Sequence, residues 1–424
     1  MTAPTPTPVP GTPGPITRRG LLRAGAIGGL GIGTVMIGGV EAAFGAPAKG
    51  SRPDTLVVIN CRGGMDALTV IPPVGDPSYA SARPTIALRP GDVKRLDDTF
   101  GLHPALGPLV PLWDARKMAV VHAAGLSGPN RSHTGATLAL ERGSPSPGVR
   151  TGWIDRAVTA TDPFTAIHLG DPSLPASLLG THRLVAAGAF DDLRTEPSDM
   201  IVPVAAWQTA LAAVTAGSPA VAGPIATALA ATARAAALPA GEAATDVGYP
   251  DTVFGQALHD VARLVKADLG LRIASVDFGG WDMHSGIGTA GRGRMVQQLS
   301  EFATTLRAFA DEVGPELDGV IVVTLSEFGR RLAENGSGGT DHGHGGAVLL
   351  FGGGVVGGKV HGTWPTLASG SLVDGDLAVT TDHRQVLAEI VTKRCGGPAA
   401  TTVFPGLSPA PIGVVHPAEI AGQP

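Results

Sequence analysis

The chain has 424 residues, enough for one large domain or two modest ones, and its hydrophobic content of 43% is ample for a core. Its formal net charge is −5, and no cluster of basic residues interrupts the sequence. A mildly acidic chain of this kind argues against a nucleic-acid partner, which needs a basic surface. Because Gly (61) and Pro (36) are plentiful, we expect many turns and loops.

The first 48 residues have the character of a targeting segment. Twin arginines, Arg18 and Arg19, precede a Gly-rich, weakly apolar stretch that runs to about Val40, and a small-residue APA sequence follows at 46–48. This arrangement is similar to a bacterial twin-arginine signal peptide. A stable transmembrane anchor is disfavoured, because glycines dilute a stretch that is already marginal against the roughly 20 apolar residues of a span. We therefore expect export by the twin-arginine route, to the periplasm, the cell wall or the medium of a bacterium.

Five short apolar runs in the remaining chain are typical of buried strands. They lie at 56–60, 117–126, 270–284, 319–329 and 346–354. Helical patterns alternate with them, for example over 296–313 and in a helix that starts near Thr381 or Asp382. Alternating strands and helices predict an α/β fold, a three-layer sandwich with a mostly parallel central sheet.

One Ala-rich segment departs from this alternation. Residues from about 203 to 245 are poor in specific side chains, and we interpret them as two or three helices that form a cap or side insertion. A structural role is favoured over a role in substrate selectivity. The segment would interrupt a single domain that spans residues 49–424.

The two cysteines, Cys61 and Cys395, have neither the spacing of a redox motif nor that of a zinc finger. A disulfide between them is one interpretation if the protein is exported. We favour the other, two buried free thiols, because cysteine is commonly buried.

Polar side chains of the kinds found in metal and catalytic sites follow four of the predicted strands. In chain order they are Asp66; Asn130, Arg131, Ser132, His133 and Thr134; Asp282 and His284; and Ser326, Glu327 and Arg330, followed by Asp341, His342 and His344. Since ligands bind at the carboxyl ends of strands in open parallel sheets, we expect these residues to share one location.

The acids and histidines of this set suit one or two divalent cations, with Zn or Mn favoured and Mg or Ca as alternatives. Two ions about 3.5–4 Å apart can clamp the attacking and leaving oxygens of a displacement. The predicted ligands are Asp66, Asp282, His284, Glu327, Asp341, His342 and His344. Ordinary structural interpretations compete with this one: Asp66 can cap a helix, and Glu327 can pair with Arg330 or Arg331.

The Ser132 hydroxyl precedes a helix-like stretch, where a helix N-terminus favours a bound anion. Arg131 is placed to hold phosphate or sulfate oxygens. A hydroxyl bound to a dication there is activated as a nucleophile, with Thr134 as the alternative to Ser132. The competing interpretation is that Ser132 only caps the helix.

Six ordered motifs lie between about residues 52 and 405: CRGGMDALTVIPP, FGLHPALGPL, GPNRSHTGATLALERG, GGWDMHSG, LSEFGRRLAENGSGGTDHGHG and GGKVHGTWP. Together they resemble the DUF1501 family of largely bacterial exported proteins, which is grouped with the alkaline phosphatase/sulfatase superfamily. The resemblance implies a doubly covered α/β sheet and a two-metal site. It implies metal ligands at Asp66, at the Asp282–His284 pair and at Asp341-His342-Gly343, and a nucleophile at Ser132.

The chain departs from the superfamily pattern in two places. Ser326-Glu327 stand at the strand end where an Asp-His pair is expected, so either Glu327 takes a metal position or the following loop folds back to place Asp341 and His342. The Cys-x-Pro-x-Arg motif of sulfatases does not occur, which disfavours formylglycine chemistry.

The resemblance favours an exported metal-dependent hydrolase of phosphate or sulfate esters, acting on a small anionic ester or a glycan-linked substrate. The alternative is a non-catalytic exported protein that retains the fold and binds a metal, a ligand or another protein. An exported protein of the DUF1800 type is a candidate partner, because members of the two families are commonly encoded close together.

Overall fold

Residues Pro53–Ile420 form the compact unit that carries the main sheet. The computed structural model describes residues 53–160, 162–193, 219–239 and 241–418 of it, with the single helical positions 209, 213 and 216. Nearer the N-terminus it describes β1 (Ile32–Ile37) and β2 (Val40–Gly45), which pair antiparallel. The rest of the predicted signal segment, twin arginines included, and most of the Ala-rich segment before residue 219 lie outside the described residues. The export signal and the domain boundary after residue 48 therefore stay predictions.

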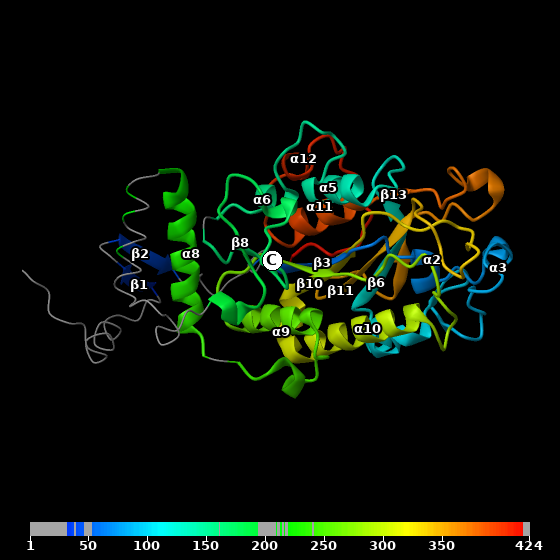
Figure 1. The fold of residues 1–424 in the computed structure, drawn as a ribbon, viewed down its shortest axis with the longest axis horizontal. Coiled ribbons are helices and arrows are strands. Elements are labelled where there is room, and N and C mark those ends of the chain that lie inside the picture. Colours follow the sequence, from blue (N-terminus) through cyan, green and yellow to red (C-terminus); the bar gives the residue numbers. More distant parts are fainter. Residues whose placement is uncertain are drawn as a thin grey trace, which may run out of the picture. The chain divides into compact units, whose positions relative to one another are not determined.

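A nine-stranded sheet lies at the centre of this unit (Figure 1), with the order β12-β6-β11-β10-β3-β9-β7-β8 and with β13 paired to β6. β11 runs antiparallel to both of its neighbours, whereas the other pairings are parallel. The predicted mostly parallel sheet is thus confirmed. The strands are β3 (Thr55–Cys61), β6 (Met118–Gly125), β7 (Ala166–Leu169), β8 (Val185–Ala187), β9 (Ile273–Phe278), β10 (Val320–Leu325), β11 (Gly346–Gly352), β12 (Lys359–His361) and β13 (Thr381–Asp382).

Helices cover both faces of the sheet, as Figure 1 shows. On one face lie α9 (Val253–Lys266) and α10 (Arg294–Val313), and on the other lie α5 (His133–Arg142), α6 (Trp153–Ala157), α11 (His383–Lys393) and α12 (Ala400–Val403). Shorter helices follow β3 along the chain: α2 (Ala67–Val70), α3 (Pro77–Ala82) and α4 (Val110–Asp114). Asp382, one of the two predicted caps, accepts from the Arg384 N–H at the start of α11. The predicted three-layer α/β sandwich is confirmed.

Alternate residues of the central strand β3 explain why both faces are covered. Val57 and Ile59 belong to the same hydrophobic cluster as Phe302 of α10, whereas Leu56 and Val58 belong to the cluster that contains Ile390 of α11. Successive side chains of a strand point to opposite faces, so a strand that is apolar throughout needs a layer on each side. The continuous run of apolar residues is therefore the sequence signal for the sandwich.

Within the nine-stranded sheet, the strands that the sequence did not indicate, β7, β8, β12 and β13, are only two to four residues long. Runs of that length carry no readable hydrophobic period. In the Ala-rich segment the structure describes one long helix, α8 (Pro219–Ala237). No helix among the described residues is long and apolar enough to cross a membrane.

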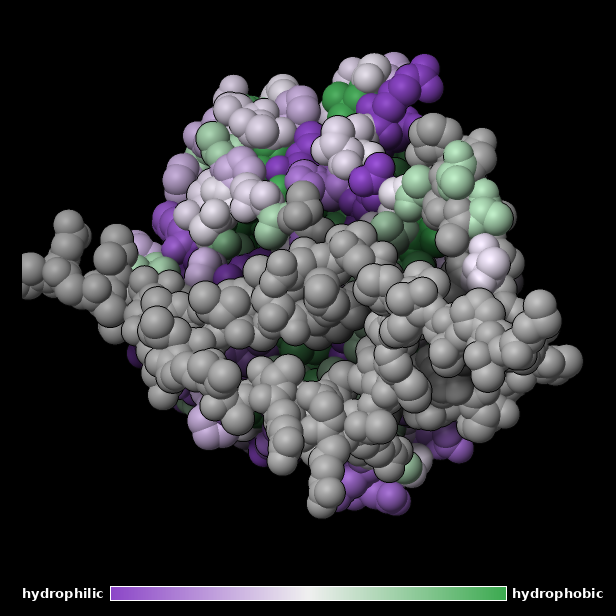
Figure 2. All heavy atoms as spheres, turned by 90° about the vertical axis from the view of Figure 1, so that its left-hand side faces the viewer, coloured by the Kyte–Doolittle hydropathy of each residue, from purple (hydrophilic) through white to green (hydrophobic). Residues whose placement is uncertain are grey.

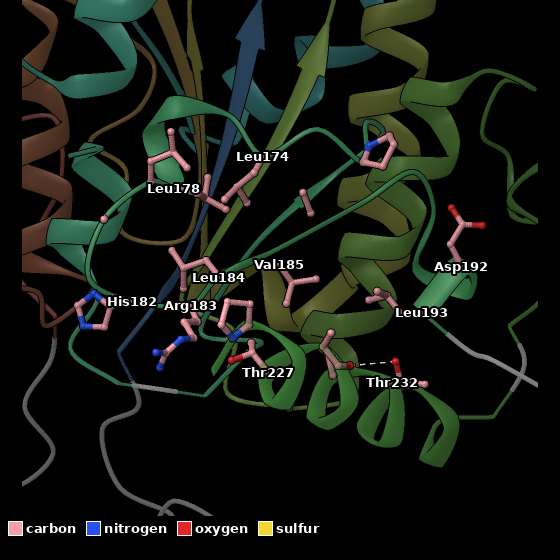
Figure 3. A pocket seen from close by; sticks show the side chains of 17 residues that line it. Leu174, Leu178, His182, Arg183, Leu184, Val185, Asp192, Leu193, Thr227 and Thr232 are labelled. Carbon is pink, nitrogen blue, oxygen red and sulfur yellow. Dashed lines mark hydrogen bonds between the residues drawn. The ribbon is translucent and has the colours of Figure 1, made fainter. Parts of the chain in front are cut away.

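A groove with a volume of about 480 Å³ lies between α8 and β8, at the edge of the sheet (Figure 3). Its wall is mostly apolar, with Leu174, Leu184 and Val185 among its lining residues, and Arg183 adds a positive charge. Figure 2 turns this end of the molecule toward the reader, and the described side chains there mix hydrophilic with smaller hydrophobic patches. The residues predicted for the metal or catalytic site do not line this groove.

Cys61 and Cys395 are buried free thiols, which confirms the favoured interpretation. Burial raises the pKa of both, that of Cys395 to about 12, so both thiols stay protonated near neutral pH.

The buried side chain of His122, in β6, is held in its neutral form. Its Nδ1 accepts from the Ala123 N–H (2.8 Å), and its Nε2 lies 3.1 Å from the Ile71 carbonyl oxygen, to which it donates. The ring also stacks on Phe100, with the centroids 4.8 Å apart. A second proton on Nδ1 would point at an N–H donor, and burial lowers the pKa of His122 to about 4.

We expect acid to destabilise the fold through His122. The pKa of histidine in an unfolded chain is about 6.5, so between that pH and about 4 the unfolded state binds more protons and the free energy of unfolding falls as pH falls. Each such group contributes up to about 1.4 kcal/mol per pH unit. His103 and His383, whose pKa values burial also lowers to about 4, act in the same direction.

Denaturant unfolding of His122→Asn at several pH values between 7 and 4.5 tests this expectation. Asn keeps an acceptor for the Ala123 N–H and does not titrate, so the free energy of unfolding should depend less steeply on pH than in the wild type. An unchanged slope would show that His122 does not contribute.

Candidate metal centre

Three histidines and a carboxylate meet at the carboxyl edge of the sheet. His133 opens α5 after β6, Asp282 and His284 follow β9, and His342 lies on the loop between β10 and β11. The Nε2 atom of His342 lies 3.1 Å from Nε2 of His133 and 3.0 Å from Nε2 of His284. Segments far apart in the sequence thus bring three imidazole nitrogens to one place.

The Asp282 carboxylate borders all three rings. Its Oδ1 lies 3.0 Å from Nε2 of His284 and 3.3 Å from Nε2 of His342, and its Oδ2 lies 3.6 Å from Nε2 of His133. The ligand atoms of His133, Asp282 and His342 all fall within 4.8 Å of one another.

The other nitrogen of each ring has an acceptor. Nδ1 of His133 lies 2.8 Å from Oε1 of Glu327, and Nδ1 of His284 lies 2.9 Å from Oδ1 of Asp341. Nδ1 of His342 lies 2.9 Å from the carbonyl oxygen of Arg131. Because these oxygens only accept, each Nδ1 would carry the proton when a metal ion occupies the centre, and each Nε2 would then present its lone pair to that ion. Metal-binding histidines are held in the same way, by an outer acceptor that fixes the tautomer.

This donor set fits a divalent metal. Lone pairs about 3 Å apart repel one another unless a cation lies among them. Bonds of about 2.0–2.1 Å in a tetrahedron place ligand nitrogens roughly 3.3 Å apart, close to the separations seen here. The Asp282 and His284 side chains are 49% and 44% exposed, so one side of the cluster faces solvent, as a site that admits a substrate requires.

Arg330 keeps Asp282 anionic. Its buried guanidinium donates to Oδ1 of Asp282 (2.6 Å), to the Gly64 carbonyl (2.7 Å) and to the Thr340 carbonyl (2.9 Å). Partial burial acts to raise the pKa of Asp282, but Arg330, together with the neighbouring histidines, lowers it to about 2. Arg330 thus pairs with Asp282, not with Glu327.

The loop after β10 folds back along the strand end. Backbone N–H groups of Gly329 and Gly343 donate to the carbonyls of His344 and Gly329, at 2.9 Å each. A Cβ on Gly343 would lie 2.3 Å from the Arg330 carbonyl carbon, and one on Gly329 would lie 1.9 Å from the Gly345 oxygen. Gly329, together with Gly343 of the GGTDHGHGG stretch (338–346), permits this close approach. The approach brings Asp341 and His342 to the cluster, while Glu327 contacts His133 from behind.

Asp66 lies outside the cluster, so the structure does not bring this predicted ligand to the others. Its buried carboxylate forms a two-point ion pair with the buried Arg83 (2.7 and 3.0 Å). It also caps α2 by accepting from the Leu68 N–H, and it accepts from the Thr69 hydroxyl. Both of its oxygens are thereby engaged.

The predicted catalytic residues border the cluster. Ser132 is exposed and caps α5, with its Oγ accepting from the Gly135 N–H (3.3 Å). Thr134 is exposed on the first turn of the same helix. The Arg131 guanidinium, predicted to hold an anion, pairs with the buried Asp376.

His344 is buried, burial lowers its pKa, and its charged neighbours are Asp376 and Arg131, not the cluster. The structure therefore does not bring this predicted ligand to the cluster. The structure brings together the other predicted ligands: Asp282, His284 and His342 at the centre, with Glu327 and Asp341 behind two of the rings.

The sequence places His133 among the polar residues at a strand end but does not predict it as a metal ligand. The NRSHTG motif drew attention to the hydroxyl before it, yet the histidine opens the helix and reaches the centre. Its position in the sequence was the signal that could have identified it. A histidine in the first turn of a helix that follows a buried strand lies at the end of the sheet where ligands bind.

Residues 220–391 match the family described as "Protein of unknown function (DUF1501)". Over these residues, the match confirms the resemblance to DUF1501 that the motifs indicate. It spans Asp282, His284, Glu327, Asp341 and His342, whereas His133 precedes it. No curated protein matches the chain significantly.

Three solved structures show weak likeness to most of the chain. One is a protein in the alkaline phosphatase superfamily from Vibrio parahaemolyticus (13% identity, TM-score 0.31), with 72% of this chain and 61% of that one covered. Another is a 2-O GAG sulfatase (10% identity, TM-score 0.35), with 83% of this chain and 74% of that one covered. The third is the lipoteichoic acid synthase LtaP from Listeria monocytogenes (8% identity, TM-score 0.33), with 80% of this chain and 76% of that one covered. TM-scores this low carry no weight for the fold, which the sheet and its two helical layers establish on their own.

Proposed function

We propose that this chain, whose residues 220–391 match DUF1501, is an exported hydrolase of phosphate or sulfate esters that depends on a divalent metal. One observation carries the proposal: the Nε2 atoms of His133, His284 and His342 converge on Asp282 while each Nδ1 is held by an acceptor. Zn or Mn suits imidazole and carboxylate ligands best, with Mg or Ca as alternatives. Export is proposed from the twin arginines.

The surroundings of the cluster support ester chemistry. A divalent cation bound there would act as a Lewis acid toward a phosphoryl or sulfuryl oxygen. The exposed Ser132 precedes His133, and its Oγ accepts an N–H bond at the N-terminus of α5. That bond leaves the hydroxyl proton free to be removed, and the helix N-terminus favours the resulting negative charge. Ser132 is therefore the proposed nucleophile, with Thr134 as the alternative.

A non-catalytic metal-binding protein is the second candidate. The observation that favours it is the Arg131–Asp376 ion pair, which engages the cation predicted to hold the transferring group. In this case the exposed side of the cluster would bind a glycan or another exported protein, with a DUF1800-type protein as a candidate.

Hydrolysis of aryl esters separates the two candidates. We expect the purified protein, loaded with Zn or Mn, to hydrolyse 4-nitrophenyl phosphate or sulfate, to lose this activity with a chelator and to regain it with added metal. Ser132→Ala should lower kcat by on the order of 10³-fold or more, because it removes the nucleophile. Metal binding without turnover of either ester would favour the second candidate.

A further inference from the structure

Asp376 is a buried carboxylate beside the metal centre that touches none of the cluster's side chains. It lies between β12 and β13 and is fully buried. Its Oδ2 accepts from Nε of Arg131 (2.9 Å) and from the adjacent Nη2, and Nη1 of Arg331 lies 3.7 Å from its Oδ1. One buried charge thus meets two arginines that are partly exposed.

Both arginines belong to the backbone that carries the ligands. The carbonyl of Arg131 accepts from Nδ1 of His342 (2.9 Å), and Arg131 stands two residues before His133. The N–H of Arg331 donates to the carbonyl of Asp341 (3.0 Å), and a backbone bridge pairs Arg331 with Asp376. The segment before α5 and the folded-back loop are therefore joined through Asp376.

We infer that Asp376 is a positioning residue of the metal centre, acting through Arg131; this inference rests on the proposed metal site. With its guanidinium anchored, Arg131 presents its carbonyl to His342 and fixes the start of the helix that carries His133. Without the carboxylate, Arg131 loses its buried partner and turns toward solvent. The Arg131 carbonyl is then no longer held next to Nδ1 of His342, and the position of His133 is no longer fixed. The metal thereby loses two ligands that were held in place before it binds.

The test is the zinc dissociation constant of Asp376→Asn, measured by competition with a chromophoric chelator. Asn keeps the shape of the side chain and removes its charge. We expect binding to weaken by on the order of tenfold or more, as changes to groups behind metal ligands do. With cobalt in place of zinc, the visible absorption spectrum should also change, which a loss of global stability alone would not cause.

Asp66→Asn is the matched control, because Asp66 is also a buried aspartate paired with an arginine but lies outside the cluster. It should leave the zinc dissociation constant unchanged. Arg131→Ala, which removes a side chain that is partly exposed, tests the pair from its other end and does not depend on the folding of Asp376→Asn.

We expect each of Asp376→Asn and Arg131→Ala to weaken zinc binding, and the double variant to weaken it no further than the stronger single change. Wild-type affinity in Asp376→Asn, or fully additive losses in the double variant, would overturn the inference. A wild-type protein that binds no zinc would overturn the metal centre itself, and the role of Asp376 with it.

Discussion

His342→Ala should abolish tight metal binding by this protein. Its Nε2 lies 3.1 Å or less from those of His133 and His284 and 3.3 Å from Asp282, so the substitution removes the central member of the cluster. The loss of affinity should exceed the roughly 10–100-fold cost of changing a group behind a ligand. Metal content after dialysis against trace zinc, measured by elemental analysis, checks this result.

His344→Ala is the matched control for His342→Ala. Both histidines belong to GGTDHGHGG, two residues apart, but the His344 side chain lies beside Asp376 and Arg131 instead of the cluster. The control should keep the wild-type metal content. Loss of metal in His344→Ala with retention in His342→Ala would place the centre on the other side of this loop and refute the arrangement described above.

The sequence predicted the sheet and the shared location because both follow from runs of residues. A buried parallel strand needs a continuous apolar run, and the polar residues after β9 and β10 stand where such strands end. Asp282, His284 and His342 were recognisable on that basis.

Which of these residues are ligands and which have supporting or structural roles could not be predicted, because the roles depend on contacts between distant segments. Glu327 follows a strand as a ligand would, yet it holds Nδ1 of His133, which is 194 residues away. Asp66 also follows a strand, and the same local pattern serves a helix cap as well as a ligand. The partner of the side chain decides between these roles. For Asp66 the partner is the buried Arg83, which comes directly after α3 in the sequence.

The ion pair between Asp66 and Arg83 makes Asp66→Asn the second change with a large expected effect. The side chains of Arg83 and Asp66 are 0% and 2% exposed, so the substitution leaves a buried guanidinium without its counter-charge. Breaking one side of a buried pair costs about 3–5 kcal/mol. We expect a loss of this size in denaturant unfolding, with unchanged metal content under native conditions.

Asp318→Asn provides the comparison, because Asp318 pairs with Lys117 at the exposed surface and its loss should cost less than about 1 kcal/mol. The outcome for Asp66→Asn also decides whether Asp66, which follows β3, has a structural role or is a metal ligand. Lowered stability with retained metal fits the structural role seen here. Retained stability with lost metal would mean that Asp66 is a ligand, as predicted from the sequence, and that its pairing with Arg83 gives way when the metal binds.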